Sequence, residues 1–94
     1  MTTNYKLFIG LNDKDTHKQE HKLQYYVSRI GKVIPDCTIV KCNGFYKSEP
    51  EQSLQVIIYG CTLAQATDYA RQFKQMFNQK EIALAEFVEQ AIFI

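Results

Sequence analysis

Four segments of the chain have the residue pattern of β-strands. Apolar and polar residues alternate over residues 4–11, where Tyr5, Leu7 and Ile9 share one face, and this period of two is typical of a half-buried strand. Three later segments are rich in strand-forming residues. We expect these strands at residues 37–47, 53–59 and 81–88, with a turn at residues 48–52.

Two other segments repeat their apolar residues with the period of an α-helix. The first follows Thr16, which has the spacing of a capping box with Gln19, and we expect this helix to end near Gly31. The second follows a similar box at Thr62. Its apolar residues recur at spacings of three and four, as on one face of a helix: Leu63, Ala66, Ala70, Phe73 and Phe77.

The resulting order, β-α-β-β-α-β, predicts a ferredoxin-like α+β sandwich. In this fold a four-stranded antiparallel sheet has both helices on one face, and the first and third strands lie in the centre. A length of 94 residues fits one domain over residues 1–94.

The predicted sheet has apolar residues on both faces, although a solvent-exposed face is normally polar. We expect a second copy of the chain to cover the face opposite the helices, so the protein should be a homo-oligomer, with a dimer as the first choice. The other candidate for covering this face is the apolar C-terminal segment 91–94, which either folds back over it or extends the last strand across a partner. The expected interface residues are Phe8, Ile57, Tyr59, Ala85, Phe87 and Phe93.

The charge balance argues against nucleic acid as the main partner. The 11 basic and 10 acidic residues give a net charge of +1, without the basic excess usual in nucleic-acid binders. Nucleic acid is therefore not the expected partner, and stacking of single-stranded bases on Phe8, Tyr59 and Phe87 is kept only as an alternative. The sequence contains neither an apolar run long enough to cross a membrane nor a signal-peptide pattern, so we expect a cytoplasmic protein without membrane contact.

The cysteines and histidines do not form a recognisable metal site. Cys37, Cys42 and Cys61 are odd in number and lack a C-x-x-C pair, so we expect buried free thiols. His17 and His21 are four residues apart, as in helical zinc pairs, but on the predicted helix both point to solvent. We expect no metal and no cofactor.

The polar segment from residue 10 to residue 20 is the main candidate for ligand contact. Asn12, Asp13 and Lys14 precede the predicted helix, and Lys18 follows them. Our main interpretation is that the segment starts the helix, and the alternative is that these residues bind a ligand. Acid and base groups are available, but they form no catalytic set in the sequence: Asp13, His17, Tyr46 and Glu49.

The chain resembles a bacterial family of small proteins of unknown function. The family has an F-G-L strand, an F-P-D-G-x-T turn, a G-x-G-x-W strand, an E-x-S-x-x-L-x-I strand and a closing F-G-Q-E-S-V. The matching segments here are YKLFIGL at 5–11, IPDCTIV at 34–40, NGFY at 43–46, EQSLQVII at 51–58 and FKQMFNQKEIAL at 73–84.

This chain departs from the family pattern at several positions. Ile9 precedes Gly10, Cys37 replaces the turn glycine, and Lys80-Glu81-Ile82 replaces E-S-V. It looks like the short forms in phages and other mobile elements. The resemblance implies the ferredoxin-like fold and no established activity. It also points to Tyr46, in the aromatic place, and Gln79, at the glutamine, as ligand-binding residues.

Three hypotheses about function follow. The first is a non-enzymatic oligomeric binding protein, encoded by a phage or mobile element, that sequesters a small ligand or blocks a host protein. The second is a small enzyme of the dimeric α+β barrel type, with a pocket between the sheet and the loops. The third is the weak single-stranded nucleic-acid binder mentioned above.

Overall fold

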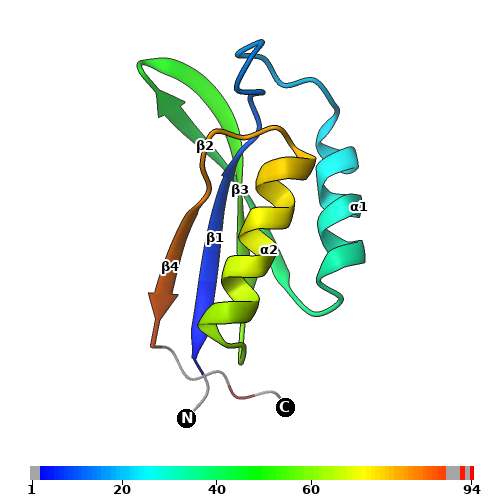
Figure 1. The fold of residues 1–94 in the computed structure, drawn as a ribbon, viewed down its shortest axis with the longest axis vertical. Coiled ribbons are helices and arrows are strands. Elements are labelled where there is room, and N and C mark those ends of the chain that lie inside the picture. Colours follow the sequence, from blue (N-terminus) through cyan, green and yellow to red (C-terminus); the bar gives the residue numbers. More distant parts are fainter. Residues whose placement is uncertain (1–2, 89–91, 93) are drawn as a thin grey trace.

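The computed structural model describes residues 3–88, 92 and 94, and its six elements follow the predicted order (Figure 1). These elements are β1 (Asn4–Gly10), α1 (Leu23–Val33), β2 (Thr38–Tyr46), β3 (Glu49–Ile58), α2 (Leu63–Met76) and β4 (Ala83–Phe87). The ferredoxin-like α+β fold is thereby confirmed. Phe93, one of the expected interface residues, lies outside the described residues.

The sheet has the order β2-β3-β1-β4, and all its neighbouring strands are antiparallel. The central strands are β1 and β3, as the fold class predicts. Leu7 pairs with Val56 on one side and with Leu84 on the other. This register places the buried side chains of three strands on the same face.

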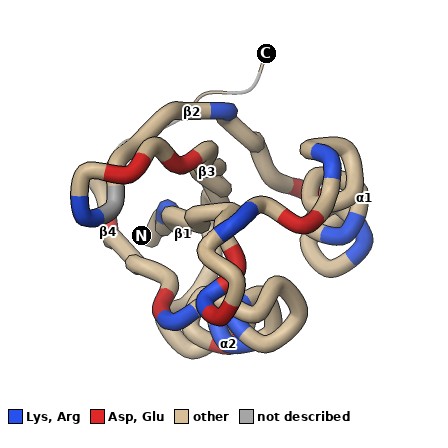
Figure 2. The backbone as a smooth tube through the Cα atoms, turned by 90° about the horizontal axis from the view of Figure 1, so that it is seen from above, with Lys and Arg blue, Asp and Glu red and all other residues tan. Residues whose placement is uncertain are grey.

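Both helices cover that face of the sheet, and the core lies between the two layers (Figures 1 and 2). Leu7, Ile9, Ile30, Val56 and Phe73 are fully buried there. Burial of side chains of this size stabilises the fold by about 1.5–3 kcal/mol each. The helices therefore leave the opposite face of the sheet for other contacts.

The start of α2 is as predicted, whereas the start of α1 is not. Thr62 accepts a hydrogen bond from the Gln65 backbone N–H at 3.1 Å, and the Gln65 side chain accepts one from the Thr62 N–H at 2.9 Å. By contrast, α1 begins at Leu23 behind Lys22, which makes no side-chain cap. It also continues to Val33, beyond the predicted end at Gly31.

The reason for the late start of α1 is a competing turn at Asp13. Its carboxylate accepts hydrogen bonds from the backbone N–H groups of Asp15 (2.8 Å) and Thr16 (3.1 Å). Thr16 donates its hydroxyl to Glu20, and His17 has a left-handed backbone with φ of 59°. Side chains of this type compete with helix formation, so residues 11–22 form a loop and the prediction that this segment starts the helix is wrong.

The β2–β3 hairpin is longer and its turn tighter than the sequence predicts. The turn consists of Lys47 and Ser48, with φ of 50° and 66°, which matches the two-residue turns that join twisted strands. Residues 49–52 belong to β3 rather than to a loop. Since β1 ends opposite Ser53, the last part of the hairpin projects beyond the central strand (Figure 1).

The open sheet face is partly apolar. Phe8 and Tyr59 each keep 37% of their surface exposed, while Ile57, Ala85 and Phe87 are half-buried. The Tyr59 and Phe87 rings meet edge to face, with their centroids 5.7 Å apart. The predicted interface residues inside the described part of the chain thus share one face, and their coverage by a second copy stays a prediction.

Two further predictions concern the cysteines and membrane-spanning helices. Cys37, Cys42 and Cys61 are free and half-buried, and burial raises the pKa of the Cys37 and Cys61 thiols. Within residues 3–88, 92 and 94, no helix has the length and apolar character needed to cross a membrane.

Candidate functional site

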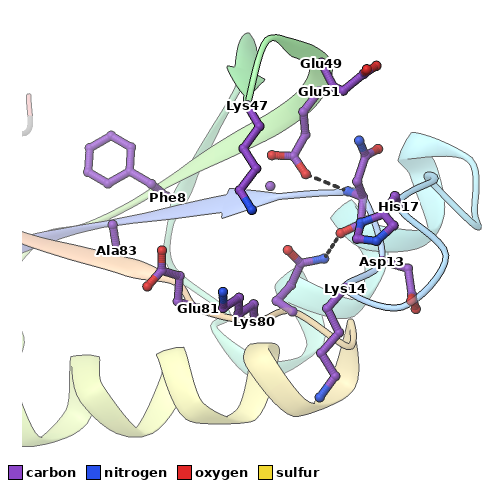
Figure 3. A pocket seen from close by; sticks show the side chains of 13 residues that line it. Phe8, Asp13, Lys14, His17, Lys47, Glu49, Glu51, Lys80, Glu81 and Ala83 are labelled. Atoms are coloured by element: carbon purple, nitrogen blue, oxygen red, sulfur yellow. Dashed lines mark hydrogen bonds between the residues drawn. The ribbon is translucent and has the colours of Figure 1, made fainter.

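A cavity of about 470 Å³ lies on the open sheet face, where β1 ends. The projecting hairpin forms one side of it, and the loop after β1 and the connection from α2 to β4 form the other (Figure 3). Its volume is in the range of small-molecule sites, about 300–1,000 Å³. The lining residues are Phe8, Gly10, Asn12, Asp13, Lys14, His17, Lys47, Glu49, Glu51, Gln79, Lys80, Glu81 and Ala83.

Alternate residues of β1 and the loop behind it form the floor. Phe8, Gly10 and Asn12 all line the cavity, because side chains two apart on a strand lie on the same face. Ala83 of β4 pairs with Phe8 and widens the apolar end. The floor is therefore apolar at Phe8 and becomes polar toward Asn12.

The carboxylate of Glu51 lies directly against Gly10. A Cβ atom at position 10 would lie 2.7 Å from the Glu51 carboxyl carbon and 2.9 Å from Oε2. The same Oε2 accepts a hydrogen bond from the Asn12 backbone N–H at 3.0 Å. Glycine at position 10 thus allows the hairpin glutamate to reach across β1 to the middle of the cavity floor.

Gln79 holds the other side of residue 12. This side chain is 6% exposed, and its Nε2 donates to the Asn12 carbonyl at 2.9 Å and to the Phe77 carbonyl at 3.2 Å. The backbone of Asn12 is therefore fixed from the hairpin by Glu51 and from the α2–β4 connection by Gln79. Figure 3 shows both hydrogen bonds as dashed lines.

Asp13 organises the loop. Besides the two N–H groups of its turn, it accepts a hydrogen bond from Asn78 Nδ2 at 2.9 Å. The Asn78 side chain, followed by the N–H groups of Asp15 and Thr16, holds the pKa of the Asp13 carboxyl below its usual range. Asp13 is consequently a carboxylate engaged in holding the turn, which argues against a role as a general base.

An aromatic cluster fixes the second half of the same loop. The His21 ring stacks on Tyr25 with a centroid separation of 3.8 Å, and the His21 N–H donates to the Tyr26 hydroxyl at 3.2 Å. Burial raises the pKa of that hydroxyl. The predicted helical pair of His17 and His21 is therefore wrong, since both precede α1. Tyr25, on the first turn of α1, is partly buried and packs against the core.

The charged lining residues are of both signs. Carboxylates come from the loop, the hairpin and the segment before β4, and lysines come from the same three places. Figure 3 shows Lys47 extending from the hairpin toward β1, and Figure 2 shows acidic and basic positions interspersed at this end of the molecule. Such a lining suits a ligand with separated positive and negative groups. Among the described residues, no three His, Cys, Asp or Glu side chains are grouped to hold a metal.

The structure brings together four of the six predicted ligand-binding residues: Asn12, Asp13, Lys14 and Gln79. Lys18 is an exposed loop residue outside the lining, and the side chain of Tyr46 lies outside the described part of the structure. Of the other acid and base candidates, His17 and Glu49 line the cavity.

The sequence interpretation misses part of the site. Gly10, Lys47 and Glu51 were assigned no ligand contact, and Phe8 was assigned only to the interface. Lys80, Glu81 and Ala83 were also missed. The E-x-S pattern at residues 51–53 and the glycine at position 10 are the signals that could have indicated the Glu51 contact.

No protein-family model matches the sequence, and a search of curated proteins finds no significant match. The resemblance to the small bacterial family therefore remains a prediction. Among the solved structures that are similar in fold are two of phage SAM lyases. A phage SAM lyase in complex with S-methyl-5′-thioadenosine has a TM-score of 0.73 and 18% identity, over 92% of this chain and 80% of that chain. A phage SAM lyase in the apo state has a TM-score of 0.71 and 16% identity, over 98% of this chain and 93% of that chain.

These neighbours overturn the leading functional hypothesis. The expectation was a non-enzymatic binding protein, because no catalytic set was visible in the sequence. Both similar structures are enzymes, and this chain shares their fold over nearly its whole length. The sequence pattern also did not show that residues from the hairpin, the loop and the α2–β4 connection line one cavity, because they meet only in the folded chain.

Proposed function

We propose that this protein is a small enzyme that cleaves S-adenosylmethionine (SAM) and releases S-methyl-5′-thioadenosine. The observation behind the proposal is the likeness in fold to two phage SAM lyases over 92% and 98% of the chain. The cavity at the end of β1 supports it, since its lining combines an aromatic ring with carboxylates and lysines. SAM has an adenine, a sulfonium, an ammonium and a carboxylate, and therefore offers a partner for each of these groups.

The proposed reaction breaks the bond between the sulfonium sulfur and Cγ of the amino-acid chain. The electron pair of that bond stays on sulfur, which becomes the neutral thioether of S-methyl-5′-thioadenosine. Cγ then gains a bond from an oxygen of the substrate's own carboxylate, which gives a lactone without water. In the alternative route a base removes a proton from Cβ, and the chain leaves as an alkene.

The cavity favours the first route. Lactone formation needs no base from the protein, because the substrate's own carboxylate is the nucleophile, whereas elimination needs a group that accepts the Cβ proton. The Asp13 carboxylate is already engaged in holding its turn, which argues against it as that base. A fixed pocket also holds the flexible chain in a reactive geometry.

The test is a chromatographic assay of purified protein with SAM, analysed by mass spectrometry for S-methyl-5′-thioadenosine and its co-product. We expect both products at equal amounts from the wild type. At SAM concentrations below saturation, Glu51→Gln should slow the reaction at least about tenfold, because it removes a charge that attracts the cationic substrate into the cavity. Glu86→Gln changes an exposed β4 glutamate outside the cavity and should leave the rate unchanged.

A wild type that releases no S-methyl-5′-thioadenosine would contradict the proposal. The co-product separates the routes: a lactone supports attack by the substrate's carboxylate, an alkene supports elimination, and homoserine that forms from the first turnovers, before any lactone has time to hydrolyse, would indicate attack by water. SAM is an intracellular metabolite, so the activity agrees with the cytoplasmic location expected from the sequence. The similar structures also support a phage or mobile-element origin.

We also propose that the chain self-associates through its open sheet face, with a dimer as the first expectation. Support comes from the exposed area of Tyr59, which lies outside the cavity lining, and from Ile92 and Ile94, which are exposed at the C-terminal end. Light scattering behind size-exclusion chromatography should give a multiple of the 10.9 kDa chain mass. Tyr59→Lys should lower that mass, and a monomeric wild type would reject the proposal.

A further inference from the structure

We infer that the cavity binds SAM in one direction, with the adenosine toward Phe8, the sulfonium against Glu51 and the amino-acid end toward Asn12. The inference rests on the proposed function, and it assigns each part of that substrate to its own subsite. It also assigns a positioning role to Gly10.

The order of residues along the floor supports this direction. Phe8, Gly10 and Asn12 follow one another on the same face, at intervals of about 6–7 Å for two residues of a strand. Phe8 offers an exposed ring beside Ala83, which suits a nucleoside base because bases stack on aromatic side chains. In SAM the sulfonium stands between the nucleoside and the amino acid, just as Gly10 stands between Phe8 and Asn12.

The middle subsite has a fixed negative charge. Oε2 of Glu51 is engaged by the Asn12 N–H, and the rest of the carboxylate lies over the Cα of Gly10. Any larger residue at position 10 would displace it, so Gly10 acts as a positioning residue for this carboxylate. A carboxylate held in this way attracts a cation without first having to be ordered.

The far subsite is polar and rigid. The backbone of Asn12 is held by Glu51 and Gln79, and Lys14 and His17 of the loop line the cavity beside it. An amide and a lysine are suitable partners for an amino-acid carboxylate. The cavity therefore distinguishes three features of a ligand: its base, its central charge and its amino-acid end.

Three ligands separate these features in a calorimetric binding experiment. Sinefungin has the nucleoside, an ammonium in place of the sulfonium and the amino-acid end, and it cannot be cleaved. S-Adenosylhomocysteine lacks the central charge, and S-methyl-5′-thioadenosine lacks both the charge and the amino acid. Each is titrated into the wild type, Phe8→Ala, Glu51→Gln and Asn12→Ala.

We expect a different pattern for each variant. Phe8→Ala should weaken all three ligands by about tenfold, through loss of stacking. Glu51→Gln should weaken sinefungin by about tenfold and the two ligands without a central charge by less than about twofold. Asn12→Ala should weaken sinefungin and S-adenosylhomocysteine and spare S-methyl-5′-thioadenosine. Gly10→Ala should reproduce the pattern of Glu51→Gln.

Loss of S-methyl-5′-thioadenosine binding in Asn12→Ala, or equal losses for all ligands in Glu51→Gln, would overturn the assigned direction while the wild type still cleaves SAM. Failure of the wild type to bind any of the three would count against the proposed function as well. Glu51→Asp, which keeps the charge on a shorter side chain, should weaken sinefungin less than Glu51→Gln. Circular dichroism checks that each variant is folded, and Glu86→Gln is the matched control.

Discussion

Buried amide groups hold the loops around the cavity, and Gln79 is the clearest case. Gln79→Leu would leave the Asn12 and Phe77 carbonyls without this donor. Because unsatisfied buried polar groups are costly, we expect a loss of about 1–3 kcal/mol in the free energy of unfolding. Urea unfolding measures it, with exposed Gln75→Leu as the control. Equal stability of the two variants would show that the Gln79 bonds contribute little.

The ionised Asp13 makes stability depend on pH. Its pKa is lower in the folded chain than the ordinary 3.8, because the Asn78 side chain and the turn N–H groups favour the carboxylate. This contribution is therefore present above that value and is lost as the pH falls through the lower, folded-state pKa. Asp13→Asn should be less stable than the wild type at neutral pH, and the difference should shrink in acid. Thermal unfolding at several pH values tests this, and a constant difference would contradict it.

Some residues of the cavity could be predicted from the sequence, and others could not. The polar loop and the resemblance indicated Asn12, Asp13, Lys14 and Gln79, because loops and closing motifs are visible locally. The contact of Glu51 with Gly10 was not predictable in the same way. It depends on the strand register and on the backbone course of the hairpin, which residue pattern alone does not determine.

At the scale of elements, the start predicted from the sequence is right for α2 and wrong for α1. The capping box of α2 forms because Thr62 and Gln65 need only each other. The apparent box at Thr16 does not form because Asp13, three residues earlier, takes the Thr16 backbone N–H, which the box would use, into a turn together with the N–H of Asp15. Local patterns predict a helix start well only when no neighbouring side chain competes for those groups.

The two threonines provide a direct comparison. Thr62→Ala should lower the free energy of unfolding by about 1 kcal/mol, since it removes a helix cap. Thr16→Ala should have a smaller effect, because Thr16 lies in the loop ahead of α1. Chemical unfolding measures the loss in the free energy of unfolding for both variants. A larger loss for Thr16→Ala would indicate that Thr16 caps α1, as the sequence predicted.

The turn between β2 and β3 lies at a different position from the one predicted, and this difference adds residues to the cavity. The proline-containing segment at residues 48–52 indicated a turn, yet Lys47 and Ser48 make the turn with left-handed backbones. Residues from Glu49 onward then continue the strand. This shift lengthens the hairpin and brings three of its side chains to the cavity: Lys47, Glu49 and Glu51.

At the scale of the whole molecule, the fold class follows from the order and period of the apolar residues. Alternation in β1 and the three-four spacing in α2 determine which faces are buried, and a layer of helices packed on one face of the sheet buries them together. The proposed function does not follow from these patterns. It rests on the likeness in fold to phage SAM lyases and on a cavity lined by β1 with the loop after it, the β2–β3 hairpin and the α2–β4 connection, which meet at one end of the sheet.

The most direct measurement of the central claim is an NMR time course with SAM labelled with ¹³C in its sulfonium methyl group. We predict that the wild type converts the sulfonium methyl signal into the thioether methyl signal of S-methyl-5′-thioadenosine, and that at SAM concentrations below saturation Glu51→Gln does so at least about tenfold more slowly. An unchanged sulfonium signal at high protein concentration, or a methyl signal that moves to another acceptor, would contradict the account.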